Sequence, residues 1–252
     1  MQEKLNRYDI MDVSLLAGKI MLESGAETYR VEDTMERIAA SFGIPKSHSY
    51  VTPTGIMFSI ETKEPTKTKL IRISERTTDL KKVTLVNSIS RRISRGEIEL
   101  EDAYEALEEI QSSTMPFPFV LQILAAAISS GCFLIMFEGS WIDFVPAMIA
   151  GGCGFITSVS LQRLIPIKFI SEFAASLILG VISFLFVYVG IGSQLDKIII
   201  SSVMPLVPGL LITNAVRDLM AGHLISGLSK GAEAFLTAFA IGAGIAAIFT
   251  VF

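Results

Sequence analysis

The sequence predicts an α-helical membrane protein with five transmembrane helices, preceded by a small α+β domain. Hydrophobic residues make up 51% of the 252 residues and charged residues only 18%, whereas a typical soluble domain carries about 25% charge. The charge is also unevenly placed, since residues 1–115 hold 16 of the 21 Lys and Arg residues and 19 of the 25 Asp and Glu residues. We therefore expect a polar domain at 1–115 and a membrane domain at 116–252. A soluble globular protein, a disordered chain and a disulfide scaffold are excluded.

The polar domain is expected to have the order helix–helix–hairpin–helix–helix. Apolar residues at spacings of three and four indicate the helices, and Pro65 marks the loop between two β-like runs. Between the first two helices, Gly25 suits a helix end, while Ser24 and Glu27 have the spacing of a capping box. The predicted elements are a helix at 9–24, a second helix that ends at 42, strands at 50–61 and 66–75, and helices at about 79–95 and 100–112.

The membrane domain contains five apolar runs in succession. A span needs about 20 mostly apolar residues to cross roughly 30 Å of hydrocarbon. One such run could be a buried core helix, but five with short connectors indicate membrane spans. The predicted spans are 117–137, 144–161, 169–190, 198–216 and 232–252.

The basic residues of the loops predict the orientation of the chain. The loops at 162–168 and 217–231 each carry two Lys or Arg residues, whereas 138–143 carries none and 191–197 carries one. By the positive-inside rule the N-terminal domain is cytoplasmic and Phe252 ends outside. The first residues are polar and show no signal-peptide pattern.

Small residues recur every four positions in two spans. In the fifth span they are Ala234, Ala238, Gly242 and Ala246, and in the second Ala150, Gly154 and Ser158. Such stripes let helices approach closely in lipid. They fit either bundling within the chain or contact with a second subunit. The odd number of spans favours a chain that forms half of a larger assembly.

The fourth span carries the most informative pattern. Pro205 and Pro208 interrupt it, and a helix restarting at Gly209 would point its positive end into the bundle, as in transporters that hold substrate carboxylates. The alternative is a proline kink that neighbouring helices satisfy. A polar face follows the break, formed by Thr213, Asn214, Arg217 and Asp218.

Two further groups of polar residues are candidates. Glu172 lies four residues after Lys168, which allows either an ordinary surface ion pair or a proton-carrying or gating group. A second group lies in the polar domain, where it forms either caps and salt bridges or a polar vestibule near a pore. Its members are Ser24, Gly25, Glu27, Thr28, Arg30 and Arg72.

Signatures of catalysis or of ATP-driven pumping are missing from the sequence. It has no P-loop, no G-x-S-x-G elbow and no H-E-x-x-H motif, and its two histidines are far apart. We therefore expect no metal, no cofactor and no enzyme activity, and the net charge of −4 argues against a nucleic-acid partner. The alternative is a membrane-anchored enzyme, with Ser24 or Thr28 beside Glu27, or an anchored sensor.

Three segments together resemble the N-terminal-type module of the threonine/serine exporter family. They are Leu22-Glu-Ser-Gly-Ala-Glu-Thr-Tyr-Arg-Val31, Thr54-Gly55 with Arg72, and Pro208-Gly209 through Asn214-x-x-Arg217-Asp218. The resemblance extends over nearly the whole chain. It places Pro208, Gly209, Asn214, Arg217 and Asp218 in the family's membrane motif.

The resemblance implies a multi-pass protein of the bacterial inner (plasma) membrane. Full-length members of that family carry a second, smaller membrane module, and none follows Phe252 here. Split members work beside a separate small membrane protein, and some split pairs are linked to succinate export. We therefore expect a subunit of a secondary transporter that exports a small carboxylate-bearing metabolite, together with a second small subunit or as a homo-oligomer.

Overall fold

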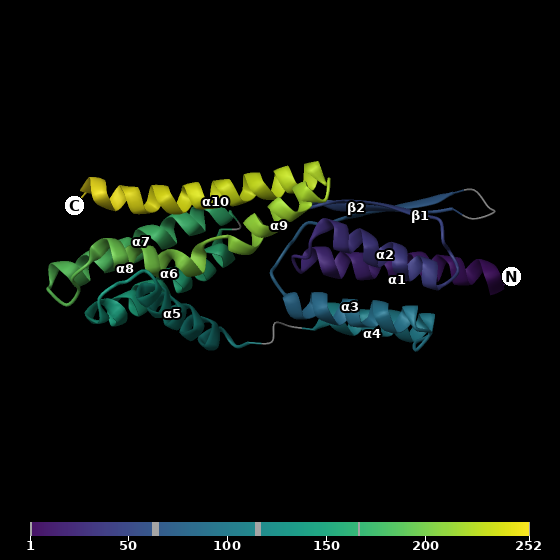
Figure 1. Cartoon of the computed structure of the whole chain (residues 1–252), viewed down its shortest axis with the longest axis horizontal. Coiled ribbons are helices and arrows are strands. Elements are labelled where there is room, and N and C mark those ends of the chain that lie inside the picture. The colour runs from purple at the N-terminus through teal and green to yellow at the C-terminus, as the bar shows by residue number, and fades with distance from the viewer. Residues whose placement is uncertain (1, 62–65, 114–116, 166, 252) are drawn as a thin grey trace. The chain divides into compact units, whose positions relative to one another are not determined.

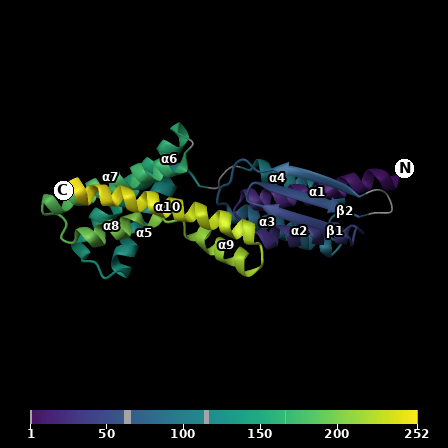
Figure 2. The same ribbon diagram turned by 90° about the horizontal axis from the view of Figure 1, so that it is seen from above.

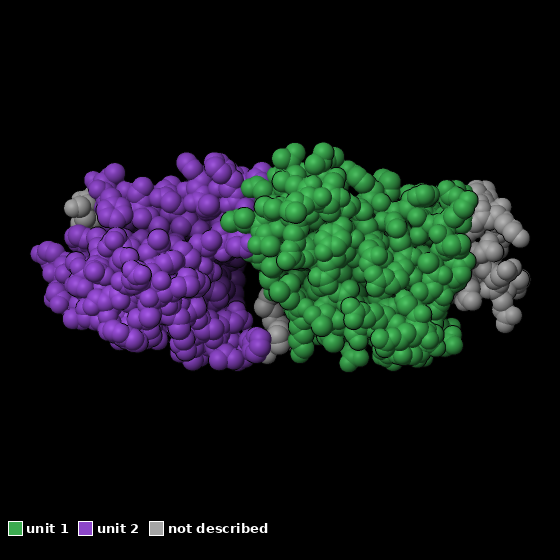
Figure 3. All heavy atoms as spheres, in the orientation of Figure 1, with its two compact units in different colours: residues 1–115, 210–231 green, residues 116–209, 232–252 purple. Residues whose placement is uncertain are grey.

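The computed structural model describes residues 2–61, 66–113, 117–165 and 167–251. The chain forms two compact units, coloured separately in Figure 3. Unit 1 contains residues 1–115 and 210–231, and unit 2 contains residues 116–209 and 232–252. Two features expected from the sequence, the Pro65 loop and the domain boundary at 115/116, lie outside the described residues.

Unit 1 has three layers. A three-stranded antiparallel sheet of β1 (Ser47–Thr52), β2 (Gly55–Ile60) and β3 (Lys67–Arg72), in that order, covers two helices (Figures 1 and 2). These helices are α1 (Gln2–Glu23) and α2 (Thr28–Ser41). The third layer consists of α3 (Leu80–Ser94) and α4 (Leu100–Ser112). The core of the unit is apolar, and its largest fully buried side chains include Phe58, Leu15, Met35 and Leu107.

The expected hairpin is present, because β2 and β3 pair antiparallel, but the sheet has three strands and not two. The run predicted as one strand at 50–61 turns back at Pro53-Thr54, and Thr52 pairs directly with Gly55. Proline has no backbone N–H to give to a central strand, so a turn is the position that tolerates it. Alternate residues of β2 face the core, since Ile56, Phe58 and Ile60 are buried.

The helix ends of unit 1 agree in part with the expectation. Asp79 caps α3 by accepting hydrogen bonds from two backbone N–H groups, and α4 has the predicted bounds. Gly25 adopts a φ of 87° at the end of α1, a conformation that favours glycine. The capping box is wrong, because Glu27 is the N-cap of α2 and makes no side-chain cap hydrogen bond. A side chain that is distant in the sequence takes the capping position.

The remaining helices are mostly apolar, and their lengths range from 3 to 28 residues. They are α5 (Phe119–Met136), the short η1 (Trp141–Asp143) with α6 (Phe144–Leu164), α7 (Lys168–Tyr188), α8 (Leu195–Val203) with η2 (Met204–Leu206), α9 (Gly209–Met220) and α10 (Leu224–Val251). Within the described residues, four of these could cross a membrane by length and composition. A fifth span results if the bent pair Leu195–Leu206 and Gly209–Met220 is counted as one.

The break of the fourth span falls where the prolines predict it. The two parts are bent by 61°, and α9 begins at Gly209. The loop expected at 217–231 is wrong, because α9 continues to Met220 and α10 starts at Leu224. The polar residues of this stretch face polar residues of the N-terminal domain, because residues 1–115 and 210–231 form one compact unit.

The two small-residue stripes have different environments. On α6, Gly154 packs against α7, and a Cβ there would lie 3.0 Å from Leu179 Cδ2. On α10, however, Ala238, Gly242 and Ala246 lie on the exposed side of the helix. The α6 stripe therefore bundles helices within the chain, whereas most of the α10 stripe does not.

Candidate functional site

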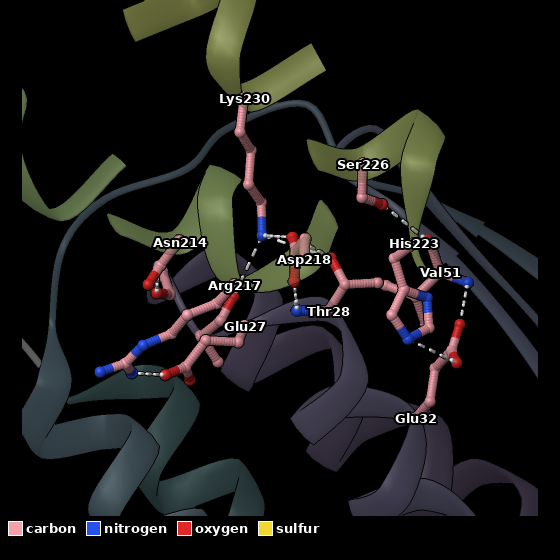
Figure 4. A network of polar contacts seen from close by, with 12 residues as sticks. Glu27, Thr28, Glu32, Val51, Asn214, Arg217, Asp218, His223, Ser226 and Lys230 are labelled. Atoms are coloured by element: carbon pink, nitrogen blue, oxygen red, sulfur yellow. Dashed lines mark hydrogen bonds and ion pairs between the residues drawn. The ribbon is translucent and has the colours of Figure 1, made fainter. Parts of the chain in front are cut away.

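A network of polar contacts joins the start of α2 to α9 and to the first turns of α10 (Figure 4). All of its members lie in unit 1. Its centre is Asp218, whose side chain is fully buried. One carboxylate oxygen accepts the backbone N–H of Thr28 at 2.9 Å, and the other accepts the Thr28 hydroxyl at 2.8 Å.

Asp218 supplies the cap that α2 lacks locally. Thr28 is the first residue of α2, and its N–H would otherwise be an unsatisfied donor. A carboxylate at this position also meets the positive end of the helix dipole. Two segments 190 residues apart are thereby fixed together by a capping interaction.

Lys230 completes the centre of the network. Its ammonium group is buried and lies 2.7 Å from Asp218 Oδ2, 3.3 Å from Thr28 Oγ1 and 3.5 Å from the Ala26 carbonyl oxygen. The three donors of the ammonium are thus directed at three oxygens. Lys230 is not among the residues predicted from the sequence, because its position was expected to lie in a loop. A single lysine at the start of an apolar helix was the available signal.

The two candidate groups that the sequence kept apart are neighbours in the fold. Asn214 Nδ2 donates to the Gly25 carbonyl oxygen at 2.8 Å. Arg217 Nη1 donates to Glu27 Oε1, so Arg217 pairs with Glu27 and not with the adjacent Asp218. The polar face of α9 therefore contacts the loop between α1 and α2.

Glu27 lies between two guanidinium groups. Arg30 Nη1 contacts its Oε2 at 3.0 Å, and Arg217 contacts its Oε1. Burial alone would raise the pKa of Glu27, but hydrogen bonds from its own backbone and from Arg217, with the charge of Arg30, outweigh burial and lower the pKa. One carboxylate thus faces two cations, and the side chains of Arg217 and Arg30 remain 55% and 38% exposed. The group carries a surplus positive charge that a solute can reach.

A second contact joins α2, β1 and the start of α10. Glu32 accepts the Val51 N–H at 2.9 Å, and Ser226 donates to the Val51 carbonyl oxygen at 3.0 Å. His223 Nε2 lies 3.7 Å from Glu32 Oε2. Burial raises the pKa of Glu32. Sequence reasoning missed these residues, because none of them forms a motif in the linear sequence.

Other candidate residues lie outside this network. Ser24 is buried and its carbonyl oxygen accepts the Asp79 N–H, while Arg72 is exposed at the end of β3. Thr213 lies on an exposed side of α9. Pro208 and Gly209 belong to unit 2, at the break before α9.

Glu172 lies in unit 2, on α7, and is buried. Lys168 lies 3.9 Å from one of its oxygens, so the expected i,i+4 pair is present. The same ammonium lies 3.4 Å from Glu233 on α10. Among the described residues, no group of three or more His, Cys, Asp or Glu side chains could hold a metal ion.

The fold and the network define a class of protein. Apolar helices of membrane length, one of them broken and carrying polar residues, are typical of polytopic transporters. The chain belongs to the threonine/serine exporter family, since the family model described as "Putative threonine/serine exporter" matches residues 12–252. That family consists of exporters and not of enzymes, which agrees with the expectation from the sequence.

Curated relatives match over most of this chain. A "Probable threonine/serine exporter" of Mycobacterium tuberculosis is 23% identical over 240 residues, which cover 94% of this chain and 45% of the relative. The "Threonine/serine exporter" of Corynebacterium glutamicum is 22% identical over 94% of this chain and 50% of its own length. The chain thus spans about half the length of these two relatives.

A shorter relative matches almost end to end. The "Probable succinate transporter subunit YjjP" of Escherichia coli is 27% identical over 241 residues, which cover 93% of this chain and 91% of the relative. No solved structure gives a significant match.

Proposed function

We propose that this chain is a subunit of a secondary transporter that exports a small carboxylate-bearing metabolite. Threonine, serine and a dicarboxylate such as succinate are the candidates. The names of the relatives support this set, since two are called threonine/serine exporters and one a succinate transporter subunit. All three candidate substrates share a carboxylate, so a carboxylate-binding group is the feature to seek.

The pair of arginines around Glu27 carries the proposal. The guanidinium of Arg217 is a planar fork that matches a carboxylate, and its side chain is 55% exposed. Glu27 already occupies one nitrogen of Arg217 and one of Arg30. A substrate carboxylate bound at Arg217 would neutralise the remaining positive charge of this group.

We assign to the other members of the network the role of holding Arg217 in place. Asn214 and Asp218 lie on α9 on either side of Arg217 in the sequence, and each is hydrogen-bonded to the loop or helix start at 25–28. Pro208 and Gly209 set the start of α9, and Thr213 adds a hydroxyl to its exposed side. In this proposal Arg217 contacts the substrate, whereas Asn214 and Asp218 are positioning residues.

A second membrane subunit is part of the proposal. The relatives named threonine/serine exporters are about twice as long as the matched region, whereas the relative matched over 91% of its length is named a subunit. We place the chain in the plasma membrane, with the N-terminus in the cytoplasm and the C-terminus outside. The 16 basic residues of the N-terminal domain and the two at 162–168 support this orientation.

Transport by inverted membrane vesicles tests the proposal. Uptake of labelled threonine, serine and succinate is compared with and without a neighbouring small membrane protein. Arg217→Lys keeps the charge but loses the fork, so we expect much lower uptake. Arg163→Lys is the matched control, because Arg163 belongs to unit 2, where it lies over the Phe119 ring, and is not a member of the network.

Two further variants separate the proposed roles. Asn214→Ala and Asp218→Asn should reduce uptake through displacement of Arg217, at matched expression. For Asp218→Asn, a smaller loss of succinate uptake than of threonine uptake would mean that Asp218 also binds the amino group of the substrate. Wild-type transport by Arg217→Lys, Asn214→Ala and Asp218→Asn together would place the binding site elsewhere.

A further inference from the structure

The two helices of the third layer of unit 1 carry opposite charges. α3 contains four basic residues and no acidic residue, whereas α4 contains five acidic residues and no basic residue. The two helices pack against each other and lie side by side on the face of unit 1 away from the sheet (Figures 1 and 2). This face of unit 1 therefore has a basic half and an acidic half.

The charged residues of both helices form stripes on the exposed side. On α3, Lys81 and Arg92 are exposed and lie about three helical turns apart, so they share one side and form a basic stripe. On α4, Glu101, Glu105 and Glu108 are exposed at spacings of four and three residues and form an acidic stripe. The buried sides of both helices are mostly apolar. Both stripes thus face away from the core of unit 1.

The chain does not neutralise these stripes itself. Within the described residues, no basic side chain of α3 forms an ion pair with a carboxylate of α4. Arg95, which follows α3, pairs with Glu97 in the connecting loop at 3.5 Å. Like charges three or four residues apart on a helix repel each other and destabilise it, as the acids of α4 do. A surface of the opposite charge would remove this repulsion.

A cavity lies beside the acidic stripe. Its volume is about 440 Å³, and its lining residues on α1 and α4 are Asp12, Val13, Leu100, Glu101, Tyr104 and Glu105. Three carboxylates and an aromatic ring suit a guanidinium group, which pairs with carboxylates as a fork and packs on an aromatic face. Lys69 already pairs with Asp12, so an incoming arginine would pair with Glu101 and Glu105.

We propose that a second copy of the chain docks on this face, with α3 of each copy against α4 of the other. A two-fold axis parallel to the two helices exchanges the basic and the acidic half, so the face is complementary to itself. Both contacts of such a dimer are the same, and each places the basic stripe of one copy on the acidic stripe of the other.

The pairing of the helices within one copy sets the level of each contact. The start of α3 lies beside the end of α4, because Lys82 Nζ donates to the Gln111 carbonyl oxygen at 2.9 Å. The last turn of α3 therefore lies at the level of the first turn of α4. A rotation about an axis parallel to the helices keeps these levels, so Arg92 of one copy meets the cavity beside Glu101 of the other.

The two-signed charge pattern favours a second copy over other partners. An anionic lipid surface or a nucleic acid would attract α3 but would be repelled by the adjacent α4. A partner protein with a uniformly basic or uniformly acidic surface would likewise match only half of the face. A second copy supplies both signs of charge in the required order.

Charge reversal in the full-length chain tests the docking face. Two differently tagged copies of the detergent-solubilised wild type should co-purify with the mass of a dimer, and added salt should weaken their association. One variant combines Lys81→Glu with Arg92→Glu, and the other combines Glu101→Lys with Glu108→Lys. Each places like charges opposite one another, so self-association should weaken by about tenfold or more in Kd. The control is Lys46→Glu, because Lys46 is exposed before β1, and this variant should dimerise like the wild type.

Mixing the two double variants separates a lost contact from a lost fold. A chain reversed on α3 and a chain reversed on α4 present opposite charges to each other at both contacts. Mixed dimers should therefore form, although neither variant pairs with itself. The chain that carries all four changes should also regain self-association, which misfolding of a double variant could not produce.

A monomeric wild type would overturn the inference, as would self-association that neither double variant weakens. Double variants that unfold at the temperature of the wild type but fail to pair when mixed would also overturn it. Binding of a monomeric wild type to vesicles of anionic lipid, abolished by Lys81→Glu with Arg92→Glu, would assign α3 to the membrane surface instead. These measurements require no substrate, so their outcome is independent of the proposed function.

Discussion

Replacing Lys230 by methionine would test how much the buried ion pair of unit 1 stabilises the fold. Methionine keeps an apolar stem of similar length but leaves the Asp218 carboxylate with only the two hydrogen bonds from Thr28. Removing one partner of a buried pair costs about 3–5 kcal/mol, because a charge is left uncompensated. Lys230→Met should therefore be among the most destabilising single changes in unit 1.

The magnitude can be measured as a shift in thermal unfolding of the detergent-solubilised chain. A domain of this size shifts its Tm by about 4 °C per kcal/mol, so we expect a decrease on the order of 10 to 20 °C. The control is Lys19→Met, because Lys19 forms only a partly exposed i,i+4 pair at 4.0 Å with Glu23. Such pairs contribute about 0–1 kcal/mol.

A double-mutant cycle with Asp218→Asn decides whether the effect belongs to the pair. Asparagine can still accept a hydrogen bond from Thr28, so the cap of α2 is partly kept. The double variant should be more stable than the sum of the single losses predicts, with a coupling energy of about 2 kcal/mol or more. A coupling energy near zero, or a Lys230→Met variant as stable as the control, would refute the reasoning.

Three further predictions concern acid stability, helix packing and orientation. The pKa of Glu27 is lowered in the folded state, so its stabilisation is complete above the ordinary value of 4.5 and is lost as the pH falls through the folded-state pKa; the Tm of Glu27→Gln should fall less on acidification than that of the wild type. Gly244→Ala should destabilise the chain in detergent because of its contacts with α7, whereas Gly242→Ala, with nothing within 4 Å, should be tolerated; equal Tm losses would refute this packing. A cysteine at Ser140 should react with an impermeant thiol reagent from outside the cell and one at Ser229 should not, and the reverse pattern would invert the proposed orientation.

The sequence determined the features that depend on local patterns. Apolar runs of membrane length give four or five candidate spans, since burial in hydrocarbon requires that length. Pro208 sets the break before α9, because proline has no N–H to continue the helix. The start of the helix at about 79 and the bounds of α4 were equally accessible, because capping residues and apolar spacing act within a few residues.

Only the tertiary structure decided which polar residues meet. Asp218 caps α2 across 190 residues, and Lys230 joins that pair from a stretch that the sequence suggested was a loop. Periodicity reports which face of a helix is apolar, but it carries no information on which distant segment will pack against it. The site exists only because the fold places the polar face of α9 against the loop that begins at Gly25. Buried donors and acceptors on the two segments then pair with one another.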